Sequence, residues 1–409
     1  MNTKMRHTPA LVGFSLLLVF AMGMPMLIFY AIGILGPELI ADLGIPKQQL
    51  GWLTTSTFGL AAVLSPWAGT AVQRIGTRGS LICLFLLVGL SFLLMAVLPG
   101  FTGLVIALLF CGIAQSFANP ATNQAIAQCV PPSVKAGIVG IKQSGVQVFA
   151  LLAGLVVPSV ALLWGWRGAL AIWMPLALLM AVVVIFFVAR PTQVTPSRSW
   201  KIPPLNKGLS ILMAIQLCAG LTLSSFMTYL GVWSGQFHVS AQTIGAMVSC
   251  FGVMGILSRV FLTPLGAKLK DETVLLGSLF VLAIAALAVM QYASTLHHWP
   301  LWVGVIGMGL TLVSTNAIAM SMLLSDPQFG QPAPSAAMLS VGFFGGFTFG
   351  PPSFGWILTH GHGFSAAWLL LMIILLCGCL LCLWLSQHCR HMYHTQIASA
   401  LDNHHVPHS

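Results

Sequence analysis

The sequence alternates long apolar stretches with short polar segments, and this alternation restricts the fold more than any other feature. A helix that crosses a bilayer needs about 20 mostly apolar residues. Division of the chain at charges, at clusters of Pro and Gly and at polar turns predicts twelve such helices. They cover residues 10–35, 49–72, 80–98, 101–126, 136–163, 168–188, 208–233, 243–267, 273–292, 299–324, 335–359 and 364–386.

Composition places the chain among multi-pass membrane proteins. Only 5% of its 409 residues are charged and 58% are hydrophobic, whereas a soluble domain has about 25% charged residues. The apolar run Pro9–Leu35 is longer than the roughly 7–15 residues of a signal-peptide core, so we expect it to be a first membrane helix. The predicted fold is all-α, with the lipid bilayer around it.

The basic residues predict an orientation. Of the 16 Lys and Arg residues, only Lys47 and Arg167 fall in segments on one side of the predicted spans, and Lys142 and Arg259 lie inside spans. The others lie on the opposite side: Lys4, Arg6, Arg74, Arg78, Lys135, Arg190, Arg198, Lys201, Lys207, Lys268, Lys270 and Arg390. Because cytoplasmic loops are enriched in Lys and Arg, both termini are expected in the cytoplasm. The net charge of +10 belongs to these segments, so no nucleic-acid partner is expected.

A Pro-rich, basic segment at residues 190–207 divides the predicted spans six and six. We therefore expect an N-terminal half at 1–189, a C-terminal half at 208–386 and a cytoplasmic tail at 387–409 that carries several histidines. Phe58–Pro66 (FGLAAVLSP) and Phe251–Arg259 (FGVMGILSR) share Phe, Gly, Leu and Ser at the same offsets. Each block lies in the second span of its half, as a duplicated transporter with its site between two repeats predicts.

The loop after the second predicted span, Gly69–Arg78, reads GTAVQRIGTR. It resembles the signature Gly-x-x-x-Asp-Arg-x-Gly-Arg-Arg of the major facilitator superfamily. The matching positions are Gly69, Arg74, Gly76 and Arg78. Gln73 stands where the family has Asp, and Thr77 stands where it has the first Arg of the final pair. The resemblance implies that this loop acts as a conformational switch.

The resemblance extends over nearly the whole chain, and residues 119–123 and 140–145 are similar to bacterial branches near the cyanate-type permeases. It implies a twelve-helix secondary transporter, a symporter or antiporter, in which two halves give access to a central site from alternate sides. We expect a monomer in the bacterial inner membrane, with a small-molecule solute as its partner and no cofactor.

Two basic residues inside predicted spans, Lys142 and Arg259, are the strongest candidates for solute binding. Charge inside a membrane is costly and normally faces a bundle interior or a water-filled cavity. In the family fold the fifth and eighth spans meet between the halves, so both cations could face one cavity. The acidic residues all fall at span ends, in loops or in the tail: Glu38, Asp42, Asp271, Glu272, Asp326 and Asp402. The pattern favours an anionic solute, since Arg binds carboxylates with two hydrogen bonds.

The alternative for these cations is structural. Lys142 would extend its amine to the membrane surface, and Arg259 would bind backbone carbonyls at a helix end. The same choice applies to neutral polar residues in the spans, which line a cavity or join helices by hydrogen bonds. Gln115 and Asn119 share one helix face, as do Gln143 and Gln147, because each pair is four residues apart. Weaker candidates for solute contact are Tyr30, Tyr229 and Asn316.

Proton coupling normally uses an intramembrane acid, and Glu38, after Pro37 at the outer end of the first span, is the nearest candidate. Exchange of solutes without a proton is the alternative. His388, His391 and His394 recur at three-residue intervals. We interpret them as part of a solvated tail, so no metal site is expected.

These features predict a secondary transporter for a small organic anion. A polyspecific efflux pump for drugs or metabolites is the first alternative, because 19 methionines and many aromatic residues form adaptable surfaces. A non-transporting membrane sensor is the second. An enzyme is not expected, since the chain has no Walker A motif and no spacing typical of a hydrolase.

Overall fold

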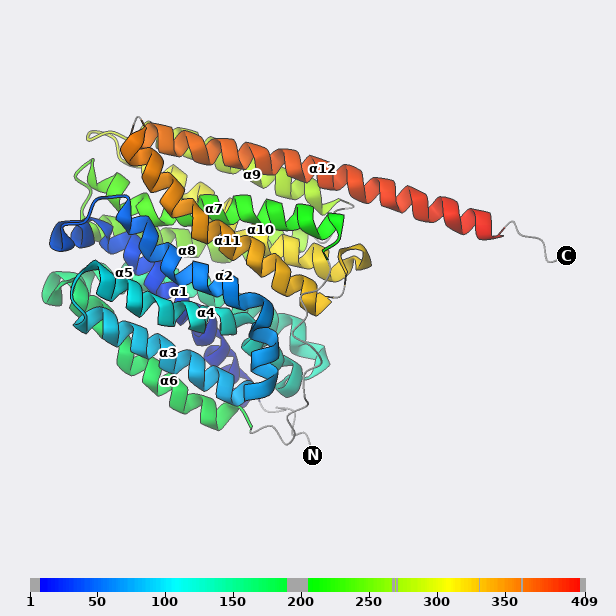
Figure 1. Cartoon of the computed structure of the whole chain (residues 1–409), viewed down its shortest axis with the longest axis horizontal. Helices are drawn as coiled ribbons and strands as arrows, with labels where there is room; N and C mark the ends of the chain where they lie inside the picture. Colours follow the sequence, from blue (N-terminus) through cyan, green and yellow to red (C-terminus); the bar gives the residue numbers. More distant parts are fainter. Residues whose placement is uncertain are drawn as a thin grey trace.

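The computed structural model describes residues 8–189, 205–266, 269, 271–330, 332–361 and 363–404. These residues form twelve α-helices and two short 3-10 helices (Figure 1). The first six α-helices are α1 Thr8–Leu43, α2 Gln49–Ile75, α3 Thr77–Val97, α4 Gly100–Cys129, α5 Lys135–Ala171 and α6 Trp173–Phe187. The second six are α7 Lys207–Gly235, α8 Ala241–Gly266, α9 Glu272–Met290, α10 Trp299–Ser325, α11 Pro332–His360 and α12 Phe364–His404. The segment 190–204 and residues 405–409, which hold most of the predicted linker and the end of the tail, lie outside the described residues.

The helices agree closely with the predicted spans, and three of them, α1, α5 and α12, extend well beyond the prediction. α1 continues to Leu43 through Pro37, because a membrane helix tolerates Pro where neighbouring helices cover the backbone. α12 continues to His404, so that part of the predicted tail is helical and projects from the bundle (Figure 1). The predicted break at residues 164–167 coincides with Gly165, which has φ 68° and interrupts the helical geometry inside α5.

Nine segments of the described chain are long and apolar enough to cross a membrane. One of them, residues 137–187, contains both α5 and α6. α2 and α11 do not meet the criterion; α2 carries the polar run Thr54–Thr57, and α11 is rich in Gly and Pro. The architecture is thus all-α and multi-pass, as expected.

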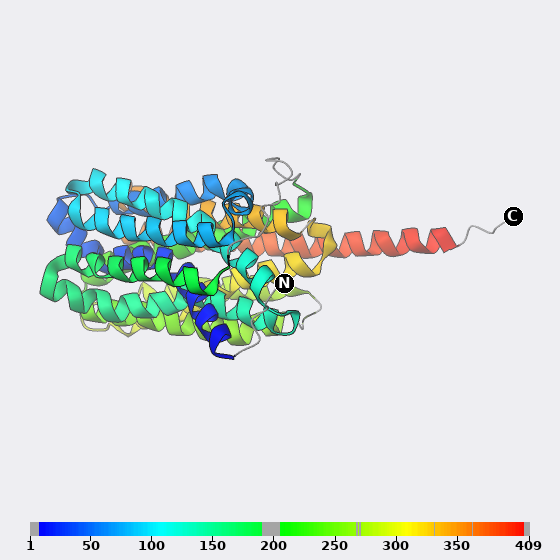
Figure 2. The same ribbon diagram turned by 90° about the horizontal axis from the view of Figure 1, so that it is seen from below.

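By their order in the chain, the helices fall into two sets, α1–α6 and α7–α12, which we call the two groups. Within the first group α2 and α3 pack on α4, and α1 packs on α5; within the second, α7 packs on α11, and α10 packs on α8 and α9. The groups meet through α2 with α11, α5 with α8, and α1 with α7. The helices run roughly parallel to the long axis, with α3 and α6 on one flank and α9 and α12 on the other (Figures 1 and 2). We call the end at which α1 begins the terminal end, and the opposite end the far end.

Glycines let the two groups approach closely near the far end. A Cβ at Gly231 of α7 would lie 2.2 Å from the carbonyl oxygen of Gly33 of α1, and one at Gly154 of α5 would lie 2.1 Å from that of Gly245 of α8. Such distances exclude any side chain, so the backbones are in direct contact, as small residues permit in membranes.

Hydrogen bonds join the groups in the same region. Thr54 and Thr228 share a hydrogen bond of 3.0 Å between their hydroxyls, and the Thr55 hydroxyl donates to the carbonyl of Thr348 at 2.7 Å. Toward the terminal end, by contrast, a Cβ at Gly69 or Gly140 would meet no atom within 4 Å. The two groups are therefore closed against each other at the far end.

Candidate functional site

A small cavity lies between the two groups, on the terminal side of the far-end closure. It has about 70 Å³ open to water-sized molecules, and its wall comes from α1, α4, α5, α7, α8, α10 and α11. Seven of the residues predicted from the sequence line it: Tyr30, Gln115, Asn119, Gln143, Gln147, Arg259 and Asn316. The structure thus brings together residues of both helix groups that are up to 286 positions apart, between Tyr30 and Asn316.

Among the described residues, Arg259 is the one cationic side chain in this wall, and no described Asp or Glu belongs to it. It is partly buried. Its Nη1 donates to the backbone carbonyl of Gln143 at 2.7 Å and approaches Gln143 Oε1 at 3.5 Å. The Nε of Arg259 is buried and has no hydrogen-bond partner. An unpaired polar group of this kind is costly in a membrane interior, so the guanidinium has an unused donor at the cavity.

Two amides in the middle of the wall also have unused hydrogen-bonding capacity. Gln115 of α4 and Gln147 of α5 are buried, and the Oε1 atom of each has no partner. A side-chain amide can present either its oxygen or its NH₂ group after a half-turn. These two residues can therefore serve a solute that brings either a donor or an acceptor.

Lys142 is fully buried and lies outside the cavity wall. Its Nζ donates to the oxygens of three α4 side chains: Asn123 at 2.6 Å, Thr122 at 2.9 Å and Asn119 at 3.4 Å. The amide of Gln143 donates to the same Asn119 oxygen at 3.3 Å. A chain of hydrogen bonds thus leads from Lys142 through Asn119 and Gln143 to Arg259.

On the opposite wall, Asn316 donates from its amide to Gln216 Oε1 at 3.2 Å, and Gln216 Nε2 donates to the carbonyl of Thr315 at 3.3 Å. Gln216 is fully buried in α7. The sequence analysis missed it, although a Gln inside an apolar span was the signal that could have found it. Asn316 is fixed by this contact and presents its remaining polar surface to the cavity.

Aromatic side chains form much of the remaining wall, and the sequence analysis missed these as well. Phe29, Phe251, Phe343, Phe344 and Phe347 all line the cavity. No sequence signal could separate them from ordinary core residues, because an aromatic residue in an apolar span most often packs in the interior.

Besides Lys142, Tyr229 and Glu38 also lie away from the cavity wall. Tyr229 stacks on Phe354 with ring centroids 4.7 Å apart, and its hydroxyl contacts the Gln48 carbonyl at 3.5 Å near the far end. Glu38 is half-buried in the last turns of α1, beyond the contact between Gly33 and α7. These positions put both residues at the far-end closure.

The segment Gly69–Arg78, predicted as a switch loop at the terminal end, is almost entirely helical: it runs from the last turns of α2 into the first turn of α3, and only Gly76 lies between the two helices. Gly76 has φ 83° and ψ 153°, which favours Gly, and lets α3 begin directly at Thr77. Thr77 is buried and donates to Gln128 Oε1 of α4 at 2.9 Å. Gln73, at the position of the family's Asp, is exposed. The loop is therefore anchored to the end of α4 by the residue that replaces the family's Arg.

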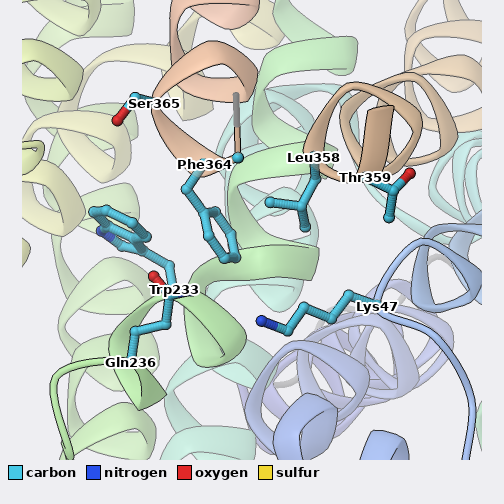
Figure 3. Close-up of a pocket in the computed structure, with 8 residues that line it drawn as sticks. Lys47, Trp233, Gln236, Leu358, Thr359, Phe364 and Ser365 are labelled. Atoms are coloured by element: carbon cyan, nitrogen blue, oxygen red, sulfur yellow. The ribbon is translucent and has the colours of Figure 1, made fainter. Parts of the chain in front are cut away.

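A second, larger hollow of about 390 Å³ lies at the far end (Figure 3). Lys47 projects into it toward Phe364, with its Nζ 5.8 Å from the ring centroid, and Trp233 lies on the other side. None of the predicted binding residues lines this hollow. It is a surface feature beyond the closed end of the bundle.

Fold and cavity together define a class: a multi-pass helical membrane protein with a cavity, lined by polar and apolar side chains, between two groups of helices. The sequence model of the Major Facilitator Superfamily matches residues 14–332 and 212–392. The chain therefore belongs to the Major Facilitator Superfamily and is a transporter rather than an enzyme.

Relatives within the superfamily differ in their cargo. The quinolone resistance protein NorA of Staphylococcus aureus (strain MRSA252) is 25% identical over 295 residues, which cover 68% of this chain and 73% of NorA. The hexuronate transporter of Bacillus subtilis (strain 168) is 25% identical over 40% of this chain and 39% of its own length. Probable anion transporter 5 of Arabidopsis thaliana is 34% identical over 30% of this chain and 28% of its own length. The alignments thus cover well under half the length of the hexuronate transporter and of probable anion transporter 5.

Among solved structures, a bacterial homologue of the human lysosomal transporter Spinster, in an inward-facing and occupied conformation, has a TM-score of 0.72. The two chains are 15% identical, and the alignment covers 93% of this chain and 98% of the other. At this identity the similarity establishes the fold.

Proposed function

We propose that this protein is a secondary transporter that moves a small organic anion across a bacterial inner membrane, with a carboxylate of the solute bound by Arg259. The observation that carries this proposal is a single guanidinium with an unpaired, buried Nε in a cavity whose wall, as far as the structure describes it, holds no acidic residue. An uncompensated cation inside a membrane is costly. A carboxylate would neutralise it and accept two parallel hydrogen bonds from it.

Alternating access supplies the mechanism. All twelve helices would cross the bilayer. The two groups would move as two halves, which are α1–α6 in residues 1–189 and α7–α12 in residues 208–386. The contacts near Gly33, Gly154, Gly231 and Gly245 favour a state closed at the far end. With both termini in the cytoplasm, as the distribution of Lys and Arg predicts, the closed far end faces the opposite side of the membrane.

The cavity must enlarge when the solute binds. Its volume of about 70 Å³ holds a few water molecules, whereas pockets for small organic ligands measure about 300–1,000 Å³. Rotation of side chains at the terminal side, where Arg259 bridges to Gln143, would open the space. Glu38 at the far-end closure is the candidate for proton coupling, and exchange of two anions is the alternative; either gives a symporter or an antiporter that works as a monomer.

A thermal-stability screen of the purified protein tests the proposal, because a ligand that binds the folded state raises its melting temperature. Small carboxylates are compared with lipophilic cations of similar size, on wild type, Arg259→Gln and Lys135→Gln. Lys135 is the first residue of α5, outside the cavity wall, and its replacement controls for the loss of one positive charge. We expect carboxylates to stabilise wild type and Lys135→Gln but not Arg259→Gln.

The efflux of drugs is a second candidate, favoured by the Met and Phe side chains of the wall and by the similarity to NorA. If lipophilic cations stabilise the protein and carboxylates do not, the anion proposal is wrong and this candidate replaces it.

A further inference from the structure

We infer, on the basis of the proposed function, that the transported anion is an aromatic monocarboxylate, whose ring lies against a wall of Phe side chains while its carboxylate binds Arg259. Three features of the cavity carry this inference: a continuous series of rings, an ordered change from apolar to polar along its length, and a single accessible charge.

The rings that line the cavity contact one another in series. Ring centroids are 4.9 Å apart between Phe343 and Phe347, 5.3 Å between Phe347 and Phe29, and 5.3 Å between Phe29 and Tyr30. Tyr30 continues the series to Phe251 at 6.2 Å. These distances lie within the range of favourable aromatic pairs, about 4.5–7 Å. The aromatic ring of a solute bound here would contact the edges and faces of these side chains.

The helix register orders the wall along the cavity. On α8, Phe251 lies toward the far end and Arg259 toward the terminal end, about 12 Å apart along the axis at a rise of roughly 1.5 Å per residue. Between them, a Cβ at Gly255 would lie 2.7 Å from the Cγ of Gln147. The amide side chain of Gln147 therefore occupies the level between ring wall and cation. A solute with a ring at one end and a carboxylate at the other matches this order.

The charge on the wall limits the solute to one negative group. Lys142 is fully buried outside the wall, and Asn119 lies between it and Arg259 in the hydrogen-bond chain. A second carboxylate would find no cation. A sugar acid would place several hydroxyls next to Phe side chains, where unpaired polar groups are costly. Among the described residues of the wall, the amide oxygens without a partner are those of Gln115 and Gln147. The wall therefore suits an aromatic monocarboxylate better than a dicarboxylate or a sugar acid.

Equilibrium binding to the purified full-length chain tests the inference with four probes of related size. They are phenylacetate, its neutral isostere phenylacetamide, the cation phenethylamine, and gluconate, which has the same charge and several hydroxyls. We expect phenylacetate to bind most tightly, at least about tenfold more tightly than gluconate, since the Phe side chains leave several hydroxyls of gluconate without partners.

Two variants assign the contacts. Phe251→Leu keeps an apolar side chain and removes one ring, and we expect it to weaken phenylacetate about two- to tenfold while leaving gluconate unchanged. Arg259→Gln should abolish the preference for phenylacetate over phenylacetamide. Phe261→Leu is the matched control, because Phe261 lies on the same helix with 67% of its side chain exposed and outside the cavity wall. Phe343→Leu serves as a second ring variant if Phe251→Leu does not fold.

The outcomes separate this inference from the proposed function. Equal or tighter binding of gluconate, still lost in Arg259→Gln, overturns the aromatic solute and leaves the anion transporter standing. Equal weakening of phenylacetate in Phe251→Leu and Phe261→Leu also overturns it. Binding that does not depend on Arg259 for any anion, or tightest binding of phenethylamine, contradicts the proposed function itself.

Discussion

At the residue scale, Lys142 and Arg259 differ in a way that their sequence positions do not reveal. Both lie inside apolar helices, and the spacing of charged residues along the chain predicted their depth. The direction of a side chain depends on how neighbouring helices pack, and only Arg259 points into the cavity wall. The Phe wall could not be predicted either, because its residues have the same composition as the surrounding core.

Lys142 is expected to be a stabilising residue that also positions Asn119. Its three oxygen partners on α4 are neutral, so the ammonium has hydrogen bonds without a counterion. Replacement by Met removes these three hydrogen bonds, and a hydrogen bond to a charged group contributes about 1.5–3 kcal/mol. We expect Lys142→Met to lower the free energy of unfolding by at least this amount in denaturant titrations of the detergent-solubilised protein.

Lys135→Met is the control for that measurement, since it removes the same charge at the first residue of the same helix. Unfolding curves that are the same for the two variants would mean that the contacts of Lys142 with α4 contribute nothing to stability.

At the element scale, most of the helices follow from the sequence. The starts of α2 at Gln49, α10 at Trp299 and α12 at Phe364 agree with the prediction, because polar turns and Pro or Gly clusters precede them. The extension of α12 to His404 was not predicted, since a polar segment gives no hydrophobic signal for a membrane helix. The contact between α5 and α8 was implied by the family resemblance and is confirmed, but its glycines were not predicted, because they depend on which faces of the two helices meet.

Gly154 and Gly140 of α5 provide a matched test of the far-end closure. A Cβ at Gly154 would lie 2.1 Å from the Gly245 carbonyl oxygen, whereas one at Gly140 would meet no atom within 4 Å. We expect Gly154→Ala to separate α5 from α8 at the far end and to raise hydrogen–deuterium exchange there, with Gly140→Ala unchanged. Equal exchange in the two variants would show that the closure does not depend on this backbone contact.

Gly76 and Gly69 provide a second matched pair in the switch loop. Gly76 has φ 83°, where other residues are strained, while a Cβ at Gly69 would meet open space. Strain of this kind costs about 1–3 kcal/mol, so Gly76→Ala should lower the melting temperature and Gly69→Ala should not. Two variants with the same melting temperature would disprove a conformational need for glycine at position 76.

At the scale of the whole molecule, the fold class and the family were predictable from the alternation of apolar and polar segments together with the loop Gly69–Arg78. The cavity was predictable only as a set of polar residues, seven of which the structure places in one wall. The closure of the bundle at the far end could not be predicted from the sequence, since a transporter's conformation depends on the balance of contacts between two groups of helices.

Counterflow in proteoliposomes tests the central claim most directly, because it detects exchange of a solute without any assumption about the coupling ion. Vesicles loaded with unlabelled phenylacetate receive labelled phenylacetate outside, with gluconate measured in parallel, for wild type, Arg259→Gln and Lys135→Gln. We predict transient accumulation of a labelled carboxylate by wild type and Lys135→Gln, and its loss in Arg259→Gln. Accumulation by Arg259→Gln at the wild-type rate would contradict the claim that Arg259 binds the transported anion.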